Sequence, residues 1–509
     1  MNIIKSTSTF SIFVLISRVL GYVRDFFIAI YLGSGPIADA FFVAFRIPNT
    51  FRRLFSEGTF NAAFVPSYSS ELVTSKLKAK NFANTVFNLL LVGLILTTLI
   101  IEIFMPSFIK IIAPGFIEDS EKFKLAINLT RITFPFLLFI SIASFFSAIL
   151  NSHNKFAAAA AAPIILNILL IICLIFANYL NDQLVYYLSY SVTIAGIIQL
   201  LFLLYFVYKF YKPRFNFIFK ANKKVKLFFK KLLPSIFSSG VTQINILIGT
   251  IIASFQASAV SYLYYADRIY QINLAIAGIA IGTVILPNLS KHIKNKNKIK
   301  TFEIQNKALE LSLFLSLPAT FALLVASKEI TSSLFGYGSF DIISVENSAK
   351  ALFFFALGLP AFSLIKIFSS FLFARNDTST PFKLSLISVI LNILISVVFF
   401  QKIGFIIIPI ATTISSWCNA ILLILIVIKN KFFYFTYNFF SKMFFILISN
   451  IISISIFYYL IVLFKNNLSY DSEYKFLLIV FLAIFTFCLY IFVSIMTKAF
   501  KISDIKLKY

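Results

Sequence analysis

Long apolar runs recur along the whole chain and constrain its fold more than any other feature. A membrane-spanning helix needs about 20 mostly apolar residues, and the 509-residue chain contains fourteen such stretches. Hydrophobic residues make up 60% of the sequence and charged residues 13%, a balance that no soluble core could bury. The stretches lie at about 10–32, 37–56, 82–106, 123–150, 157–178, 184–208, 232–255, 259–289, 308–327, 348–373, 384–400, 404–428, 441–464 and 476–497. The sequence therefore predicts an all-α, polytopic membrane protein, and it excludes soluble enzymes, nucleic-acid binders and secreted scaffolds.

The basic residues are distributed unevenly between alternate connections. If the N-terminus is cytoplasmic, the cytoplasmic segments hold 31 of the 45 Lys and Arg residues and the outer connections hold 8. Cytoplasmic segments of membrane proteins are enriched in Lys and Arg, so both termini are expected in the cytoplasm. The net charge of +26 is then expected to face anionic lipid headgroups rather than nucleic acid.

Short motifs recur at a nearly constant separation in the two halves of the chain. Pro135, Phe146, Asn151 and the run 165–169 have counterparts 225 residues later, at Pro360, Phe371, Asn376 and 390–394. Residues 44–47 and 65–69 resemble 266–269 and 286–290, at separations of 222 and 221. Because six spans make up one period, both copies have the same orientation, and a pseudo-twofold axis along the membrane normal would relate them.

This duplication predicts the domain organisation. We expect residues 1–208 to form an N-lobe of six spans and residues 209–231 to form a basic cytoplasmic linker. Residues 232–428 would form the C-lobe, and 429–509 would add two spans and a cytoplasmic tail.

Charged residues at membrane depth are concentrated in three of the spans. Each such charge costs about 2.5–3.5 kcal/mol at a helix centre, so it needs a partner, water or a function. The first two spans carry Arg18, Arg24, Asp25, Asp39, Arg46, Arg52, Arg53 and Glu57, and the eighth carries Asp267 and Arg268. If these three spans line the junction of the lobes, they predict one central, net-positive cavity.

Structural explanations of these charges remain open. Arg52 and Arg53 lie near the end of their span, where long cationic side chains reach the interface. Asp39 and Arg46 lie seven residues apart on one helical face and could form an ion pair. Arg268 could likewise pair with the adjacent Asp267.

The sign of the predicted cavity indicates an anionic substrate. Arginine holds phosphate through a planar fork of donors and does not lose its charge, so several arginines suit a diphosphate. The chain lacks a Gly-rich ATP-binding loop. His153 and His292 are expected in solvated loops, and the three cysteines show no metal-binding or redox spacing. We therefore expect no cofactor, no metal and no catalytic residue.

Three early motifs and three later ones resemble the signature of the MurJ (MviN) lipid II flippases. The early motifs are residues 17–25 (SRVLGYVRD), 39–49 (DAFFVAFRIPN) and 52–58 (RRLFSEG). The later ones are 264–268 (YYADR), 286–290 (LPNLS) and 373–381 (FARNDTSTP). They appear in the family's order and span nearly the whole chain.

The resemblance implies a fold and a function. The family belongs to the multidrug/oligosaccharidyl-lipid/polysaccharide exporter superfamily, with two six-helix lobes around a cationic cavity. It moves the undecaprenyl-diphosphate-linked peptidoglycan precursor, lipid II, to the outer leaflet of the bacterial inner membrane. The positions that match its substrate-binding residues are Arg18, Arg24, Asp39, Arg52 and Arg268. Some members use a carboxylate of the seventh span for sodium, and residues 232–255 contain none.

The resulting hypothesis is alternating access by a monomer that works beside other cell wall synthesis proteins. The alternatives are a flippase for another lipid-linked oligosaccharide, a cation-coupled drug exporter, a membrane enzyme acting on polyprenyl phosphates, and a scaffold.

Overall fold

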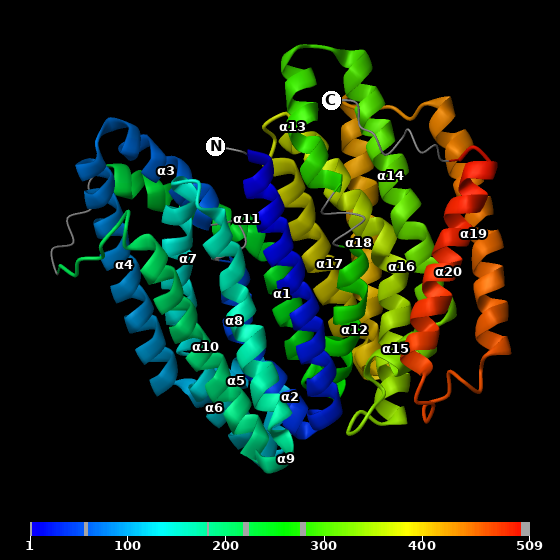
Figure 1. The fold of residues 1–509 in the computed structure, drawn as a ribbon, viewed down its shortest axis with the longest axis horizontal. Coiled ribbons are helices and arrows are strands. Elements are labelled where there is room, and N and C mark those ends of the chain that lie inside the picture. The colour runs from blue at the N-terminus through cyan, green and yellow to red at the C-terminus, as the bar shows by residue number, and fades with distance from the viewer. Residues whose placement is uncertain (1–2, 55–59, 181–182, 217–222, 275–280, 500–509) are drawn as a thin grey trace. The chain divides into compact units, whose positions relative to one another are not determined.

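The computed structural model describes residues 3–54, 60–180, 183–216, 223–274 and 281–499 (Figure 1). These residues form helices and no strand. Glu57 lies outside the described residues, as does part of the motif 52–58. The side chain of Arg53 is not described either.

The expected all-α membrane protein is confirmed. Nine helical runs among the described residues are long and apolar enough to cross a membrane. Two of these runs each comprise more than one helix. Ser120–Ser152 contains α6 and α7, and Ser379–Lys429 contains α17 and α18. The first two predicted spans are not among these nine runs, and their helices carry several charged side chains. The count of fourteen spans stays a prediction.

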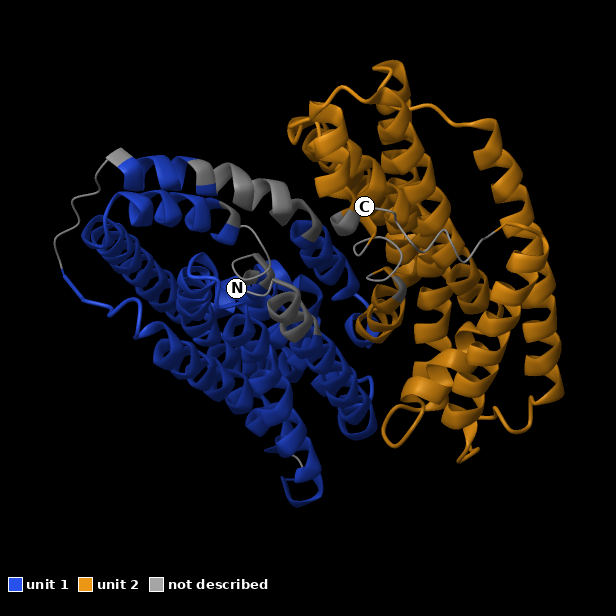
Figure 2. Ribbon diagram, turned by 45° about the horizontal axis from the view of Figure 1, so that its top comes forward, with its two compact units in different colours: residues 1–261 blue, residues 262–509 orange. Residues whose placement is uncertain are grey.

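The described chain divides by its contacts into two compact units, residues 1–261 and 262–509 (Figure 2). In unit 1, α8 packs on α1 and α10, α7 packs on α10 and α3, and α2 packs on α6. Its elements are α1 (Ile3–Leu32), α2 (Pro36–Leu54), α3 (Phe60–Thr74), α4 (Lys76–Ile103), α5 (Met105–Ile112), η2 (Pro114–Glu118), α6 (Ser120–Thr133), α7 (Phe136–Ser152), α8 (Phe156–Ile175), α9 (Ala177–Leu180), α10 (Leu184–Val207) and α11 (Lys223–Ala253).

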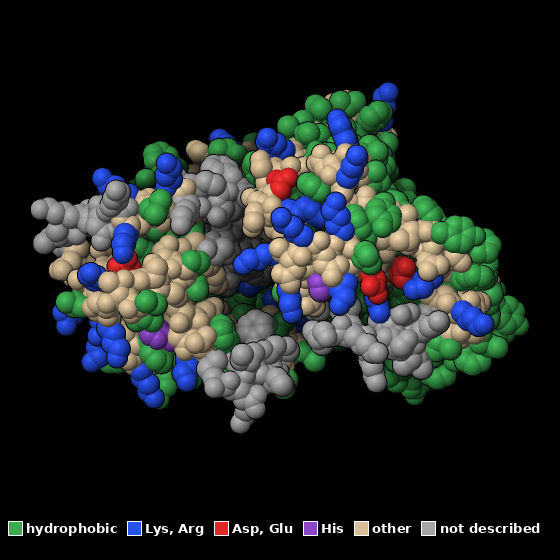
Figure 3. Space-filling model, turned by 90° about the horizontal axis from the view of Figure 1, so that it is seen from above, with side chains coloured by type: hydrophobic (Ala, Val, Ile, Leu, Met, Phe, Trp, Pro, Cys, Tyr) green, Lys and Arg blue, Asp and Glu red, His purple; other side chains and the backbone are tan. Residues whose placement is uncertain are grey.

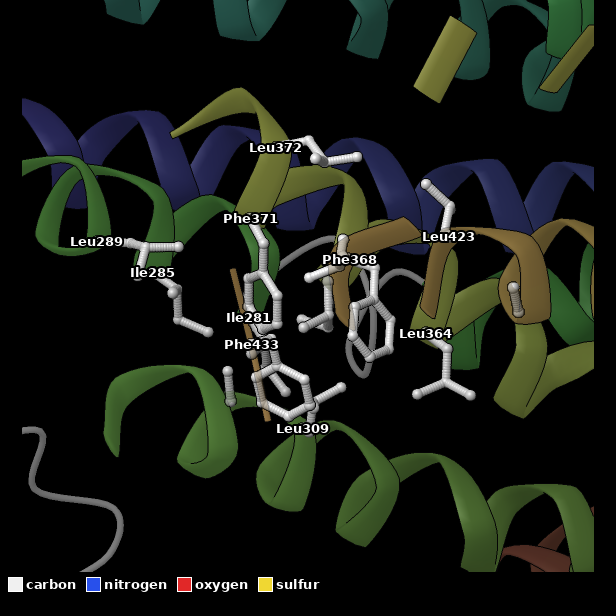
Figure 4. Packing of buried hydrophobic residues seen from close by; sticks show 14 of the residues in the cluster. Ile281, Ile285, Leu289, Leu309, Leu364, Phe368, Phe371, Leu372, Leu423 and Phe433 are labelled. Carbon is white, nitrogen blue, oxygen red and sulfur yellow. The ribbon is translucent and has the colours of Figure 1, made fainter. Parts of the chain in front are cut away.

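Helix α16 is the centre of unit 2 and packs on α13, α14, α15 and α18. The unit takes in most of α12 (Ala259–Leu274), and then α13 (Ile281–Lys294), α14 (Lys298–Val325), α15 (Ser327–Phe335), α16 (Ile342–Phe373), α17 (Ser379–Ile403), η5 (Gly404–Ile406), α18 (Ile407–Lys429), α19 (Tyr437–Leu463) and α20 (Lys475–Met496). In Figure 4, Phe368 and Phe371 of α16 meet Ile281 and Ile285 of α13, Leu309 of α14 and Phe433. This apolar cluster holds the four segments together through the van der Waals contacts of closely packed side chains.

The chain boundaries of the units differ from the expected lobes. Helix α11 continues through the end of the predicted linker as one helix and packs on α2, α3 and α5 of unit 1. The lobe boundaries were inferred from the duplication and not from contacts, so they stay a prediction.

One buried asparagine in each unit makes the same hydrogen bonds. Asn88 of α4 donates to the carbonyls of Asn84 and Arg214, and its own Oδ1 accepts from the amide of Asn216. Asn306 of α14 donates to the carbonyls of Phe302 and Tyr434, and its Oδ1 accepts from Thr436. Each asparagine thus joins a helix to the segment that follows another helix. These contacts agree with the predicted duplication, although neither asparagine belongs to the sequence repeats.

Basic side chains gather at one end of each unit. Figure 3 shows many Lys and Arg side chains on the face that it views, with few Asp and Glu side chains among them. Exposed residues at α3–α4 and α13–α14 include Lys76, Lys78, Lys80, Lys294 and Lys298. The uneven distribution expected from the sequence therefore has a counterpart on the surface.

Candidate functional site

Arg24 is buried in unit 1 and held on two sides. Its Nε and Nη2 donate to Asp25 Oδ1 at 3.0 and 2.7 Å, and its Nη1 donates to Asn167 Oδ1 at 2.9 Å. The guanidinium also lies 5.4 Å from the centre of the Phe45 ring. Arg24 is 5% exposed and Asp25 is 2% exposed, so the pair forms where water is scarce and each charge needs the other.

Asn167 links this pair to the neighbouring turns of α1. While its oxygen accepts from Arg24, its Nδ2 donates to the carbonyl of Ser17 at 2.9 Å. Because Asn167 lies in α8, it fixes α1 against α8 at the level of Arg24. Asn167 belongs to the repeated run 165–169. A polar residue in a repeated run of an apolar helix is a sequence signal by which Asn167 could have been found.

Arg18 lies six residues before Arg24 on α1 and differs from it in exposure and in its polar contacts. Its side chain is exposed, and no described residue forms a hydrogen bond or ion pair with it. An unpaired cation at membrane depth needs water or an anion beside it. Arg18 is therefore available to a ligand, whereas Arg24 is already engaged by protein groups.

Asp39 of α2 is fully buried and saturated with donors. Its carboxylate accepts from Lys122 Nζ at 2.7 Å, from the amides of Ser258 and Ser261 at 3.0 and 2.9 Å, and from Ser261 Oγ at 2.6 Å. It thereby caps the start of α12 and neutralises a lysine that is itself 6% exposed. The ion pair of Asp39 with Arg46 that the sequence allowed does not form.

Arg46 and Arg52, on the same helix, point to different partners. Arg46 Nη1 donates to the hydroxyl of Thr250 in α11, and Arg52 Nε donates to Asn49 Oδ1 at 3.0 Å. Arg52 is half-buried and lines a cavity of about 20 Å³ inside unit 1, together with residues of α7, α8 and α10.

Arg268 is a half-buried cation of unit 2. Its Nη2 donates to Tyr264 Oη at 2.9 Å, and its guanidinium lies 4.8 Å from the centre of the same ring. The neighbouring Asp267 accepts from Gln271 Nε2 instead, and no ion pair joins it to Arg268. A stacked guanidinium keeps its remaining donors in a fixed plane, which suits an oxyanion.

Lys366 is a further cation at membrane depth that the sequence analysis did not single out. It lies within α16, its side chain is exposed, and no described residue pairs with it. It was overlooked because it belongs to no motif and has no charged residue close to it in the sequence.

The late motif 373–381 has a structural role in this molecule. Arg375 donates to the carbonyls of Phe371 and Phe432 at 2.7 and 2.8 Å, and it stacks 4.5 Å from the centre of the Phe432 ring. Burial lowers the pKa of Arg375 to about 10, so the guanidinium stays charged at neutral pH. It joins the end of α16 to the α18–α19 connection.

His153 is half-buried rather than solvated, contrary to expectation. Its ring stacks on Phe210 with 4.4 Å between centres, and Tyr68 Oη lies 3.3 Å from its Nε2. Burial, assisted by the charge of Lys76, lowers the pKa of His153. Among the described residues, no group of three or more His, Cys, Asp or Glu side chains could hold a metal ion.

Comparison with known proteins gives consistent results. A family model described as "Lipid II flippase MurJ" matches residues 28–481. The "Probable lipid II flippase MurJ" of Rickettsia prowazekii is 41% identical over 421 residues, which cover 82% of each chain. The "Lipid II flippase MurJ" of Burkholderia cenocepacia is 32% identical over 431 residues, or 84% of each chain.

Solved structures are similar over most of the chain. One, described as "Lipid II flippase MurJ, inward closed conformation", has a TM-score of 0.80 and 25% identity, covering 96% of this chain and 98% of that one. An inward-facing multidrug resistance MATE family transporter of the MOP superfamily has a TM-score of 0.65 at 15% identity, covering 81% of this chain and 94% of that one. This second likeness shows the fold alone.

Proposed function

The chain belongs to the MurJ family of lipid II flippases, and from this premise we propose that it carries lipid II from the cytoplasmic to the outer leaflet of the bacterial inner membrane. Lipid II is the undecaprenyl-diphosphate-linked precursor of peptidoglycan, so the protein serves cell wall biogenesis. It acts by alternating access as a transporter and performs no covalent chemistry on its substrate.

The exposure of the Arg18 side chain is the observation that supports the proposal most strongly. Arg18 is an exposed cation in α1, without a hydrogen-bond or ion-pair partner among the described residues. A diphosphate supplies the anionic partner that such a residue lacks, and it binds the guanidinium fork through two oxygens.

The other candidate residues take different parts in binding. Arg268 and Arg52 are half-buried and present further guanidinium donors to the diphosphate. Arg24, tied to Asp25 and Asn167, contributes a charge that is fixed in place before the substrate arrives. Asp39 acts indirectly, since its carboxylate is filled by Lys122, Ser258 and Ser261 and it holds α12, the helix of Arg268.

The membrane potential supplies the drive. Moving negative charge outward across an inside-negative membrane gains about 2.3 kcal/mol per charge per 100 mV. The polyprenyl chain stays in lipid while the sugar-peptide headgroup crosses in water. The uneven basic residues favour cytoplasmic termini, and a monomer beside other cell wall enzymes suffices for this mechanism.

A leaflet-accessibility assay in proteoliposomes tests the proposal. Lipid II placed in one leaflet should become accessible in the other when the protein is present, and faster when a potential is imposed. Arg18→Ala should abolish transfer and Arg18→Lys should keep part of it, because charge survives without the fork. Lys402→Ala, which removes an exposed cation from the last turn of α17, should change nothing. Unchanged transfer by Arg18→Ala would contradict the proposal.

The same assay separates the alternatives. A flippase for another lipid-linked oligosaccharide would move that lipid and leave lipid II in place. The likeness in fold to MATE transporters makes drug export the second candidate, and a drug exporter would confer resistance without moving lipid II. A polyprenyl-phosphate enzyme would change the mass of the recovered lipid.

A further inference from the structure

Gln199 of α10 is a buried amide that the mechanism has not used. It is 1% exposed, and neither its Nε2 nor its Oε1 has a hydrogen-bond partner among the described residues. Leaving two polar atoms unpaired in an apolar helix bundle costs free energy, and buried amides are almost always hydrogen-bonded to protein or water. The position therefore needs an explanation.

The side chain of Gln199 lines the same cavity as Arg52. The cavity measures about 20 Å³, and a single water needs about 10–15 Å³. Ser144 and Ser147 of α7 are the other polar residues in its wall, and no Asp or Glu lines it. Ser144 Oγ already donates to the carbonyl of Ile140 at 2.8 Å, which leaves its lone pairs as acceptors.

We propose that this cavity binds one water that joins the Gln199 amide to the Arg52 guanidinium, and that Gln199 is thereby a positioning residue for the diphosphate. The water accepts one hydrogen bond from Arg52 and a second from Gln199 Nε2, and it donates to Gln199 Oε1. Both unpaired amide atoms are then satisfied. This inference rests on the proposed function, in which Arg52 contacts the diphosphate.

The proposed water links Arg52 of α2 to α10. The bond from Arg52 Nε to Asn49 joins two residues of α2 one turn apart, so it cannot fix the guanidinium relative to other helices. A water shared with Gln199 joins α2 to α10. An arginine that is held by two helices presents its donors in one orientation. Less conformational entropy of its side chain is then lost when an oxyanion binds.

Gln305 of α14 provides a matched control. It is fully buried, and both of its amide atoms also lack a partner among the described residues. It does not line the cavity of Arg52. Any effect of losing a buried, unpaired amide as such should therefore appear equally at Gln305 and Gln199.

A double-mutant cycle tests the proposal on the full-length protein in detergent, with undecaprenyl diphosphate as the probe and microscale thermophoresis as the measurement. Gln199→Leu should weaken binding about fivefold, the scale of one hydrogen bond. In the Arg52→Ala background, Gln199→Leu should cause no further loss, since the group it positions is gone. Gln305→Leu should leave affinity unchanged in both backgrounds.

Three results would overturn the inference. They are an unchanged affinity of Gln199→Leu, an equal loss in both Arg52 backgrounds, and an equal loss in Gln305→Leu. Should Gln199→Leu not accumulate, Gln199→Asn keeps the amide but shortens its reach, and it should show a smaller loss that again disappears with Arg52→Ala. If the wild-type protein binds undecaprenyl diphosphate no better than undecanol, the proposed function itself fails, which is a distinct outcome.

Discussion

The two units bury different kinds of side chain. Among the described residues, unit 1 buries five charged side chains, those of Arg24, Asp25, Asp39, Glu71 and Lys122, and unit 2 buries only that of Lys475. Both units also bury many apolar side chains, and in unit 2 one apolar cluster centres on Phe368 and Phe371 of α16. The units therefore differ in the charge that they bury, and ion pairs take part in the interior of unit 1.

The repeated asparagines show how the difference arises. Asn167 and Asn392 occupy equivalent places in the duplicated run, and each is 6% exposed. Asn167 accepts from the cation of Arg24, whereas Asn392 donates to Thr412 Oγ1 at 3.1 Å and accepts from Ser396. The helix position and the amide are shared between the units, and only the neighbours differ. The same asparagine position thus meets a cation in unit 1 and two hydroxyl groups in unit 2.

The largest difference between the units should appear at their ion pairs. Asp39→Ala leaves Lys122 charged and buried and should destabilise the protein by about 3–5 kcal/mol. Glu310→Ala in unit 2 removes the partner of Lys442, which is 31% exposed, and should cost about 1 kcal/mol or less. The midpoints of thermal unfolding in detergent measure both. Similar shifts would show that buried charge does not distinguish the units.

A second test compares two arginines within unit 1. Arg24→Ala should lower stability by about 3 kcal/mol, because the carboxylate of Asp25 remains buried without its partner. Arg18→Ala should leave the unfolding midpoint unchanged, since its side chain is exposed and forms no hydrogen bond or ion pair with a described residue. Both substitutions should weaken the binding of lipid II, measured by thermophoresis. Loss of stability in Arg18→Ala would mean that Arg18 has a structural partner.

The equivalent asparagines give a smaller, matched comparison. Asn167→Leu removes a hydrogen bond to a charged group and should cost about 2 kcal/mol. Asn392→Leu removes its bonds to the hydroxyls of Thr412 and Ser396, which join neutral groups, and should cost about 1 kcal/mol. If thermal unfolding ranks the two variants in the opposite order, the charge of Arg24 contributes less in unit 1 than we infer.

The smallest expected effect is a pH dependence confined to unit 1. The pKa of His153 is lowered in the folded protein, so the unfolded chain binds the proton more readily. Stability should therefore be constant above about pH 6.5, the ordinary histidine value, and decline as the pH falls below it. His153→Phe preserves the stack on Phe210 and should reduce the decline between pH 7 and pH 5.5. An identical decline in the variant would assign the effect to other groups.

The sequence predicted the structural class because the class follows from the length and composition of single stretches of the chain. The length of the apolar stretches requires helices in a membrane, and the described helices match most of those stretches. The resemblance to the MurJ family was found from six sequence motifs and from their order along the chain. Arg18, Arg24, Asp39, Arg52 and Arg268 were chosen in the same way, by their place in motifs and by the cost of charge in apolar spans.

What each of these residues touches was decided by tertiary structure alone. Arg24 meets Asn167 across 143 residues of chain, Asp39 meets Lys122 across 83 and Ser261 across 222, and no periodicity links such positions. The sequence could not separate the engaged Arg24 from the exposed Arg18, because both are arginines of one helix six residues apart. The free energy of a buried charge depends on the neighbours that folding brings to it, and only the packed helices supply them.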